Sequence, residues 1–223
     1  MKLKTASCCS GICAPEIAWR NLGWKPVWFS EIDPFASAVE KHHFPEVPNL
    51  GDMNSIDGKK YHGAIDVFVA GTPCQSFSVA GLRKGMADPR GNLALVFLRL
   101  VDQIRPRWVV WENVPGVLSS GDGRDFGSFV GGLGQLGYGW AYRTLDAQHF
   151  GVPQRRRRVF VVGHLGDWRR AAAVLFERAC LSGNPAPRRE TGQRIAASLT
   201  RRIDRGGVNS EGHDNHLIPD LAG

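Results

Sequence analysis

One cysteine, Cys74, stands in a segment whose residue types favour nucleophilic chemistry. It follows the apolar run AIDVFVAG and lies in the polar turn GTPCQSFS, between Pro73 and Gln75. A cysteine at the end of a strand is exposed and fixed in direction, and its thiolate is a strong nucleophile. Most single cysteines are inert packing residues. The polar turn favours a nucleophilic Cys74 over that alternative.

A second reactive group is the carboxyl of Glu112, which follows the apolar residues Val109, Val110 and Trp111 in RWVVWENVPG. A carboxyl group that leaves so apolar a strand is expected to be desolvated. Desolvation favours the protonated form, which can donate a hydrogen bond or act as an acid. The alternative is a carboxylate at a strand end that simply faces water.

Four consecutive arginines form a third feature, in the segment FGVPQRRRRVFVVG. Alternation along an extended chain puts Gln154, Arg156 and Arg158 on one face, with Arg155 and Arg157 on the other. One face would enter a site while the other meets phosphates. Taken alone, such a run is more often a surface patch.

Two earlier loops have the residues of a nucleoside site. In CCSGICAPE, Gly11 permits a tight turn and exposes amide groups at a helix start. In SEIDP, Glu31 stands where an acidic side chain accepts hydrogen bonds from both ribose hydroxyls of a nucleoside cofactor. The competing interpretation of SEIDP is helix capping by Asp33. Asp52 and Met53 would bracket an adenine, although Gly-Asp is also a common turn.

These residues all follow short apolar runs that alternate with segments of helix length. The sequence predicts strands over 5–9, 27–32, 65–70, 108–111 and 159–163, and helices over 15–22, 34–43, 93–104, 125–136 and 168–181. Such alternation predicts an α/β fold with a doubly wound, mostly parallel sheet. Ligands bind outside the carboxyl ends of the strands in such a sheet, where the residues above lie.

Composition narrows the class of protein. The chain has 223 residues, 43% hydrophobic and 22% charged, with a net charge of +7 that is rich in arginine. This charge suits a polyanionic partner, although a solvated basic surface explains it equally well. The five cysteines form no CxxC pair and no zinc-site spacing, so we expect reduced thiols and no metal. The sequence shows no secretory signal and no membrane span, so we expect a soluble cytoplasmic protein.

Three motifs in this order resemble the cytosine-5 DNA methyltransferase family of phages and bacteria. They are Pro73-Cys74-Gln75, Glu112-Asn113-Val114 and the QxRxR pattern of 154–158, and the similarity covers about residues 3–165. The segment SGICAPE is similar to the family's FxGxG cofactor loop, with Cys9 in place of the aromatic residue and Cys13 in place of the second glycine. The resemblance implies a Rossmann-like methyltransferase that uses S-adenosyl-L-methionine.

The resemblance also implies roles for individual residues. Cys74 would attack carbon-6 of a cytosine flipped out of double-stranded DNA, Glu112 would stabilise ring nitrogen 3, and Arg156 would join this catalytic group. Glu31 would hold the ribose, Ile12 and Ile32 would flank the adenine, and Asp52 would bind its amino group. The remaining candidates are Gly11, Met53, Pro73 and Leu93 for the cofactor, and Gln75, Ser78, Asn113, Gln154 and Arg158 for the substrate.

The resemblance stops after the arginine run. We predict a catalytic and cofactor-binding domain over 1–165, followed by a helix and polar tail over 166–223 that begins an incomplete target-recognition region. Three interpretations stay open, namely a truncated gene product, an expressed fragment, or one half of an enzyme completed by a second polypeptide. Two other function classes also stay open, a non-catalytic DNA-binding remnant and a transfer-RNA cytosine-5 methyltransferase.

Overall fold

A computed structural model describes residues 2–73 and 93–176 of the chain. The chain divides into two compact units. The first contains Met1–Thr144 and Arg158–Arg178, and the second contains Leu145–Arg157 and Ala179–Gly223. The predicted nucleophile Cys74, together with Gln75 and Ser78, lies outside the described residues.

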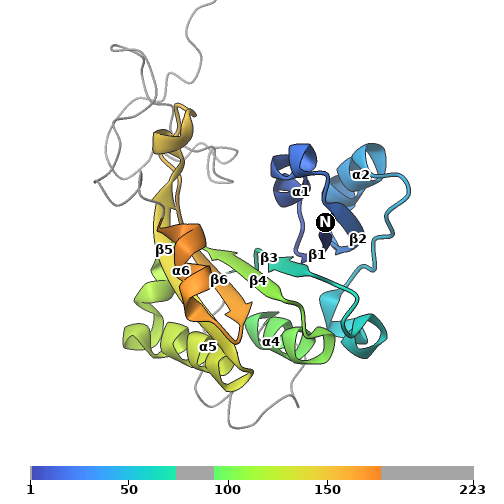
Figure 1. Cartoon of the computed structure of the whole chain (residues 1–223). Coiled ribbons are helices and arrows are strands. Elements are labelled where there is room, and N and C mark those ends of the chain that lie inside the picture. Colours follow the sequence, from blue (N-terminus) through green and yellow to red (C-terminus); the bar gives the residue numbers. More distant parts are fainter. Residues whose placement is uncertain (1, 74–92, 177–223) are drawn as a thin grey trace, which may run out of the picture. The chain divides into compact units, whose positions relative to one another are not determined.

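A six-stranded sheet organises the first unit, in the order β2-β1-β3-β4-β6-β5 (Figure 1). Strand β1 is parallel to β2 and β3, and β3 is parallel to β4, whereas β6 is antiparallel to β4. The strands are β1 (Lys4–Cys8), β2 (Lys25–Ser30), β3 (Val67–Ala70), β4 (Trp108–Asn113), β5 (Tyr138–Asp146) and β6 (Arg157–Leu165). This confirms the predicted α/β fold with a mostly parallel sheet.

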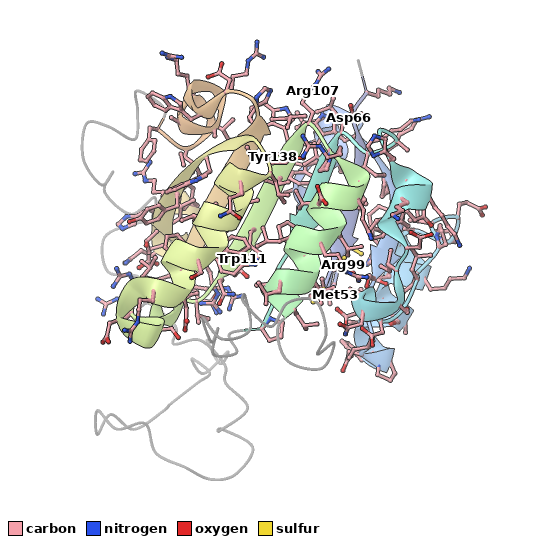
Figure 2. All side chains as sticks on the ribbon, turned by 90° about the horizontal axis from the view of Figure 1, so that it is seen from below. Met53, Asp66, Arg99, Arg107, Trp111 and Tyr138 are labelled. Atoms are coloured by element: carbon pink, nitrogen blue, oxygen red, sulfur yellow. The ribbon has the colours of Figure 1, made fainter. Side chains whose placement is uncertain are left out.

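Helices cover both faces of this sheet (Figures 1 and 2). In β4, Val109 and Trp111 pack into the large core beneath α4 and α5, while Trp108 and Val110 pack with α6 on the other face. The α-helices are α1 (Ala14–Ala18), α2 (Pro34–His43), α4 (Leu93–Ile104), α5 (Arg124–Gln135) and α6 (Trp168–Leu175). Short 3-10 helices cover Arg20–Leu22, Met53–Ser55, Gly58–Tyr61, Pro115–Leu118, Ser120–Gly123 and Ala147–Phe150.

Local sequence explains where two of these helices form. Helix α2 begins at Pro34, and the Asp33 side chain caps it by accepting a hydrogen bond from Ala36 N at 2.9 Å. Capping by Asp33, the competing interpretation of SEIDP, is therefore confirmed. Helix α5 contains several glycines, and one of them packs closely against α4: a Cβ atom at Gly132 would lie 2.7 Å from Leu98 Cδ1.

Several predicted boundaries differ from the structure. The helix predicted over 15–22 is two pieces, because α1 ends at Ala18 and a 3-10 turn follows. Strand β2 starts at Lys25 and contains Pro26, which an edge strand tolerates because its outer side needs no ladder hydrogen bond. Helix α6 packs against the sheet through Ala171 and Leu175, although the predicted boundary after residue 165 separated the two. Within the described ranges, no helix is long and apolar enough to cross a membrane.

Candidate active site

The loop that follows β1 turns sharply toward the end of β2. Its backbone has a positive φ at Cys9 (49°), Gly11 (56°) and Cys13 (61°). Cys9 N donates a hydrogen bond to Ser30 O at 2.8 Å, and Gly11 N donates to Glu31 Oε2 at 2.8 Å. The loop is therefore held against the carboxyl end of the neighbouring strand.

The carboxylate of Glu31 organises this end of the sheet. Its Oε1 accepts hydrogen bonds from Ile32 N at 2.8 Å and Asp33 N at 2.9 Å, in addition to the Gly11 bond on Oε2. The Asn49 side chain accepts from Glu31 N and donates to Glu31 O, both at 3.0 Å. Glu31 therefore has a fixed backbone and a fixed carboxylate at the predicted ribose position.

Exposed apolar side chains accompany this carboxylate. Ile12 is 54% exposed, and Ile32 and Phe35 are each 74% exposed. An acidic group beside uncovered apolar side chains suits a nucleoside, whose base is apolar on its faces and whose ribose donates hydrogen bonds. These residues fit the nucleoside part of S-adenosyl-L-methionine. Phe35, in the first turn of α2, was not among the predicted residues, because its only signal in the sequence is an apolar side chain next to SEIDP.

The residues predicted to bracket the adenine lie on a tightly bonded turn. Ser30 Oγ donates to Gly51 O at 2.6 Å, and Asp52 Oδ1 accepts from Asn54 N at 2.9 Å. The Met53 side chain is buried in the core, and Arg99 of α4 contacts its carbonyl oxygen at 3.5 Å (Figure 2). Cofactor contacts by Asp52 and Met53 stay predictions.

The two other predicted cofactor residues flank the segment that the structure does not describe. Pro73 is exposed after β3, and Leu93 is partly buried against the core at the first turn of α4. Their contacts with the cofactor also stay predictions.

Glu112 pairs with Arg158 across the antiparallel strands β4 and β6. Arg158 Nε lies 2.9 Å from Glu112 Oε1, and the two side chains are 23% and 29% exposed. A Cβ atom at Gly71 would lie 3.4 Å from Glu112 Oε2 and 3.8 Å from Cys9 O. The ends of β1, β3 and β4 therefore meet near this carboxylate. Its desolvation is partial, because the side chain reaches the surface.

The residues that immediately precede Cys74 are anchored to β4. Trp111 Nε1 donates to Thr72 Oγ1 and Asn113 Nδ2 donates to Thr72 O, both at 2.9 Å. Asn113 Oδ1 also accepts from Val114 N at 2.8 Å. Asn113 was predicted to bind substrate, whereas the structure shows a buried amide bonded to the chain itself; its contact with a base stays a prediction.

Gln154 and Arg156 belong to the second unit. Arg156 N donates to Asp146 Oδ1 at 3.2 Å, and Ala147 N donates to Arg156 O at 3.0 Å. Desolvation raises the pKa of Asp146, but hydrogen bonds from Gln148 and Arg156 hold it below the ordinary value. Strand β6 begins only at Arg157, so the single extended face predicted over 154–158 is not formed by one strand. The predicted catalytic role of Arg156 stays a prediction.

The cysteines of β1 and of the loop after it are poor nucleophiles. Burial, together with nearby Glu31 and Asp52, raises the pKa of Cys9 to about 11. Burial and then Glu40 raise the pKa of Cys13 to about 12. Burial also raises the pKa of Cys8 well above its ordinary value. At neutral pH these thiols stay protonated, which leaves them unsuited to nucleophilic attack.

Fold and site together define a class of protein. The parallel strand β2 ends at a carboxylate with exposed apolar neighbours, and an ion-paired glutamate lies near the end of the parallel strand β4. This is the arrangement of a Rossmann-like methyltransferase, and solved methyltransferases share the fold. One is a DNMT2 variant of Spodoptera frugiperda, with 25% identity and a TM-score of 0.62, covering 74% of this chain and 51% of that one.

The chain belongs to the C-5 cytosine-specific DNA methylase family, whose family model matches residues 3–207. It is 43% identical to the DNA N-6-adenine-methyltransferase of Escherichia phage P1 over 246 residues, covering 86% of this chain and 32% of that protein. It is 36% identical to the type II methyltransferase M.AquIA of a Picosynechococcus species over 180 residues, covering 74% of this chain and 73% of that relative. Members of the family use S-adenosyl-L-methionine as methyl donor.

The chain covers only part of several of these relatives. It spans 32%, 33% and 38% of the length of three curated phage methyltransferases that it matches. The matched part contains the sheet, the Glu31 loop and the Glu112 strand.

Proposed function

We propose that this chain carries the nucleophile and the cofactor-binding part of an enzyme that methylates carbon-5 of cytosine in DNA. The observation that carries the proposal is one sheet edge that presents two distinct groups. Glu31 with its exposed apolar neighbours follows β2, and the Glu112–Arg158 pair lies beside Gly71, three residues before Cys74. Family membership supports the same function.

The proposed reaction begins with addition of the Cys74 thiolate to carbon-6 of the cytosine ring. The new sulfur–carbon bond breaks the 5,6 double bond and makes carbon-5 nucleophilic. Glu112 stabilises the ring at nitrogen 3 by donating a hydrogen bond or proton, and Arg158 orients its carboxyl group. Carbon-5 gains a methyl group and then loses its proton, and the returning electron pair expels the Cys74 thiolate. Arg156 and Gln154 are proposed to hold the same base.

The proposed cofactor site uses residues from three loops. Glu31 accepts from the ribose, Ile12, Ile32 and Phe35 contact the adenine, and Asp52 binds its amino group. S-adenosyl-L-methionine supplies an electrophilic methyl group on a sulfonium. Exposure of the apolar side chains and the fixed direction of the Glu31 carboxylate support this assignment.

The proposed substrate is double-stranded DNA with the target base flipped out of the stack, because carbon-6 is inaccessible within a duplex. The arginine run supplies phosphate contacts, which carry little sequence information. We propose that target choice needs residues beyond the described units, for example on a complementing polypeptide. By itself the chain should bind DNA weakly, with strong salt dependence and little sequence preference.

Covalent trapping tests the nucleophile. A duplex with 5-fluorocytosine blocks the last step, because fluorine cannot leave carbon-5 as the proton does. With cofactor, and with the complementing polypeptide where one is needed, the wild-type chain should form a complex that survives denaturation. Cys74→Ser should form none, and the matched control Cys180→Ser should trap like wild type. Trapping by Cys74→Ser would refute the assignment.

Product analysis separates this function from its alternatives. One relative is named an N-6-adenine-methyltransferase, and a structural neighbour is a DNMT2 protein. DNA and transfer RNA are offered in competition with isotopically labelled cofactor, and the modified nucleosides are identified by mass spectrometry. 5-Methylcytosine in DNA supports the proposal. N-6-methyladenine, label confined to transfer RNA, or DNA binding with no transfer in the completed enzyme contradicts it.

Bisulfite sequencing tests whether the chain alone can select and methylate a target sequence. DNA incubated with the chain and S-adenosyl-L-methionine alone should show little methylation. Adding a polypeptide with a family target-recognition region should restore turnover at one short sequence. Efficient methylation of a defined sequence by this chain alone would show that its own residues suffice for target choice.

A further inference from the structure

After β3 the chain reaches Thr72, which is bonded to two other buried side chains. Trp111 Nε1 donates to Thr72 Oγ1, Asn113 Nδ2 donates to Thr72 O, and each bond measures 2.9 Å. Thr72, Trp111 and Asn113 are all buried. Thr72 is therefore bonded through its side chain and its backbone, two residues before Cys74 in the sequence.

Strand register explains why these residues meet. The parallel pairing of β3 and β4 sets Ala70 opposite Trp111. Side chains two residues apart in an extended chain point to the same side. Thr72 therefore continues the side of Ala70, which is the core side that Trp111 also occupies. Asn113, two residues beyond Trp111, reaches the same threonine from that side.

The indole of Trp111 is itself held rigidly. Its ring centroid lies 4.2 Å from that of Phe129 in α5, and the side chain is fully buried. A buried indole N–H without an acceptor is costly, so the Thr72 hydroxyl is an energetically important partner. The two hydrogen bonds to Thr72 form an anchor that ties this residue to a fully buried part of the core.

We propose that Thr72 and Trp111 are positioning residues for Cys74. The proposal rests on the proposed function, in which the Cys74 thiolate must reach a base held near Glu112. Two residues of chain span at most about 7 Å, so the anchor restricts where the thiol can lie. An error of about 1 Å in such a placement can cost about 10²-fold in rate.

The first test compares trapping rates on 5-fluorocytosine duplex at saturating cofactor and DNA. Thr72→Val keeps the shape but removes the acceptor, and Trp111→Phe removes the donor. Each should slow trapping about 10-fold, the value of one lost hydrogen bond, with unchanged dissociation constants for DNA and cofactor. The double variant should be no slower than either single one. Thr72→Ser should restore the wild-type rate.

A matched control separates anchoring from general stability. Thr5 is also a buried threonine of this sheet, and its hydroxyl has no hydrogen-bond partner in the described part of the chain. Thr5→Val should therefore trap at the wild-type rate. A merely structural effect of Thr72→Val would lower thermal stability and leave the trapping rate unchanged at low temperature.

The second test reads the position of Cys74 without any methyl transfer. Alkylation by iodoacetamide at pH 8, followed by mass spectrometry, should differ at Cys74 by at least about threefold from the wild-type rate in Thr72→Val and Trp111→Phe, because the bonds that restrict the chain before Cys74 are lost. Thr72→Ser and Thr5→Val should match wild type. Cys9 and Cys13 serve as internal controls in every sample.

The outcomes distinguish the two proposals. If Cys74 of the wild-type chain is alkylated normally but never forms the trapped DNA complex, even in a completed enzyme, the proposed function is refuted. The alkylation rates of the variants then still test the anchor at Thr72. Wild-type alkylation in Thr72→Val overturns the anchor. Single effects that multiply to about 100-fold in the double variant also overturn it, because coupled partners must give a smaller combined effect.

Discussion

The two halves of the sheet's carboxyl edge are stabilised in different ways. After β1 and β2, a partly exposed loop is held by one carboxylate, whose acceptors bind the backbone of Gly11, Ile32 and Asp33. After β3 and β4, buried side chains hold Thr72, while Glu112 turns to the opposite side and pairs with Arg158. In the first half, the candidate ligand group Glu31 also holds the loop in place. In the second half, the side chains that hold the chain are different from Glu112, the candidate catalytic group.

This difference predicts different responses to mutation. In the first half, a change at Glu31 should alter ligand affinity and loop shape together. In the second half, a change at Glu112 should alter rate while the anchor at Thr72 keeps the loop in place.

The largest expected effect is at Glu112. Glu112→Gln preserves the shape of the side chain but removes the acid and the ion pair with Arg158. Single-turnover methyl transfer should fall by about 10²-fold or more, the usual contribution of general acid–base catalysis. Cofactor affinity, measured by calorimetry, should stay within about twofold of wild type. Glu46→Gln, at an exposed position, is the matched control; equal rates for the two variants would mean that Glu112 is only a strand-end carboxylate.

A smaller effect is expected at Glu31. Glu31→Gln keeps one acceptor oxygen but loses the charge that strengthens its bonds to backbone amides and ribose. Cofactor affinity should fall about 10-fold, since a hydrogen bond to a charged group contributes about 1.5–3 kcal/mol. Asp33→Asn removes a charge two residues away and keeps a good helix cap, so its affinity should match wild type. If both variants bind equally, general electrostatics rather than a specific contact at Glu31 governs binding.

The smallest effect concerns Glu40, which lies beneath the β1 loop and accepts a hydrogen bond from Ser10 Oγ at 2.5 Å. Burial, partly offset by the Ser10 bond, raises the pKa of Glu40. For an acid whose folded pKa is raised, the stability penalty is absent below the unfolded value and grows as pH rises through the folded value. Glu40→Gln should therefore melt a few degrees higher than wild type at pH 8, and this gain should shrink toward pH 4. A gain that does not depend on pH would contradict titration of Glu40 as its cause.

Much of this fold could be predicted because the inner strands are short apolar runs. Val67–Ala70 and Trp108–Asn113 are recognisable from composition, and helices α2 and α4 begin and end at the predicted residues. Strand β5 was missed because its sequence, YGWAYRTLD, has a glycine and polar residues and no apolar run. Its Gly139 is explained only by tertiary contact, since a Cβ atom there would lie 2.2 Å from Trp168 N.

The candidate site could be predicted only where chemistry is local in sequence. Gly11 and Glu31 follow strand ends, and the structure shows them bonded to each other. The Thr72–Trp111 bond joins residues 39 positions apart, so no local pattern reveals it. The same holds for the Asn113–Thr72 bond, which joins residues 41 positions apart. Long-range register decided these contacts.

The acceptor count at Glu31 limits how a ribose can bind. A carboxylate offers about four lone-pair positions, and the backbone amides of Gly11, Ile32 and Asp33 occupy three of them. One position is left, so one hydroxyl can bind without disturbing the loop. A second hydroxyl must displace an amide or share its acceptor. Removing one of the two ribose hydroxyls from a nucleoside should therefore lower its affinity by less than the loss of one full hydrogen bond would.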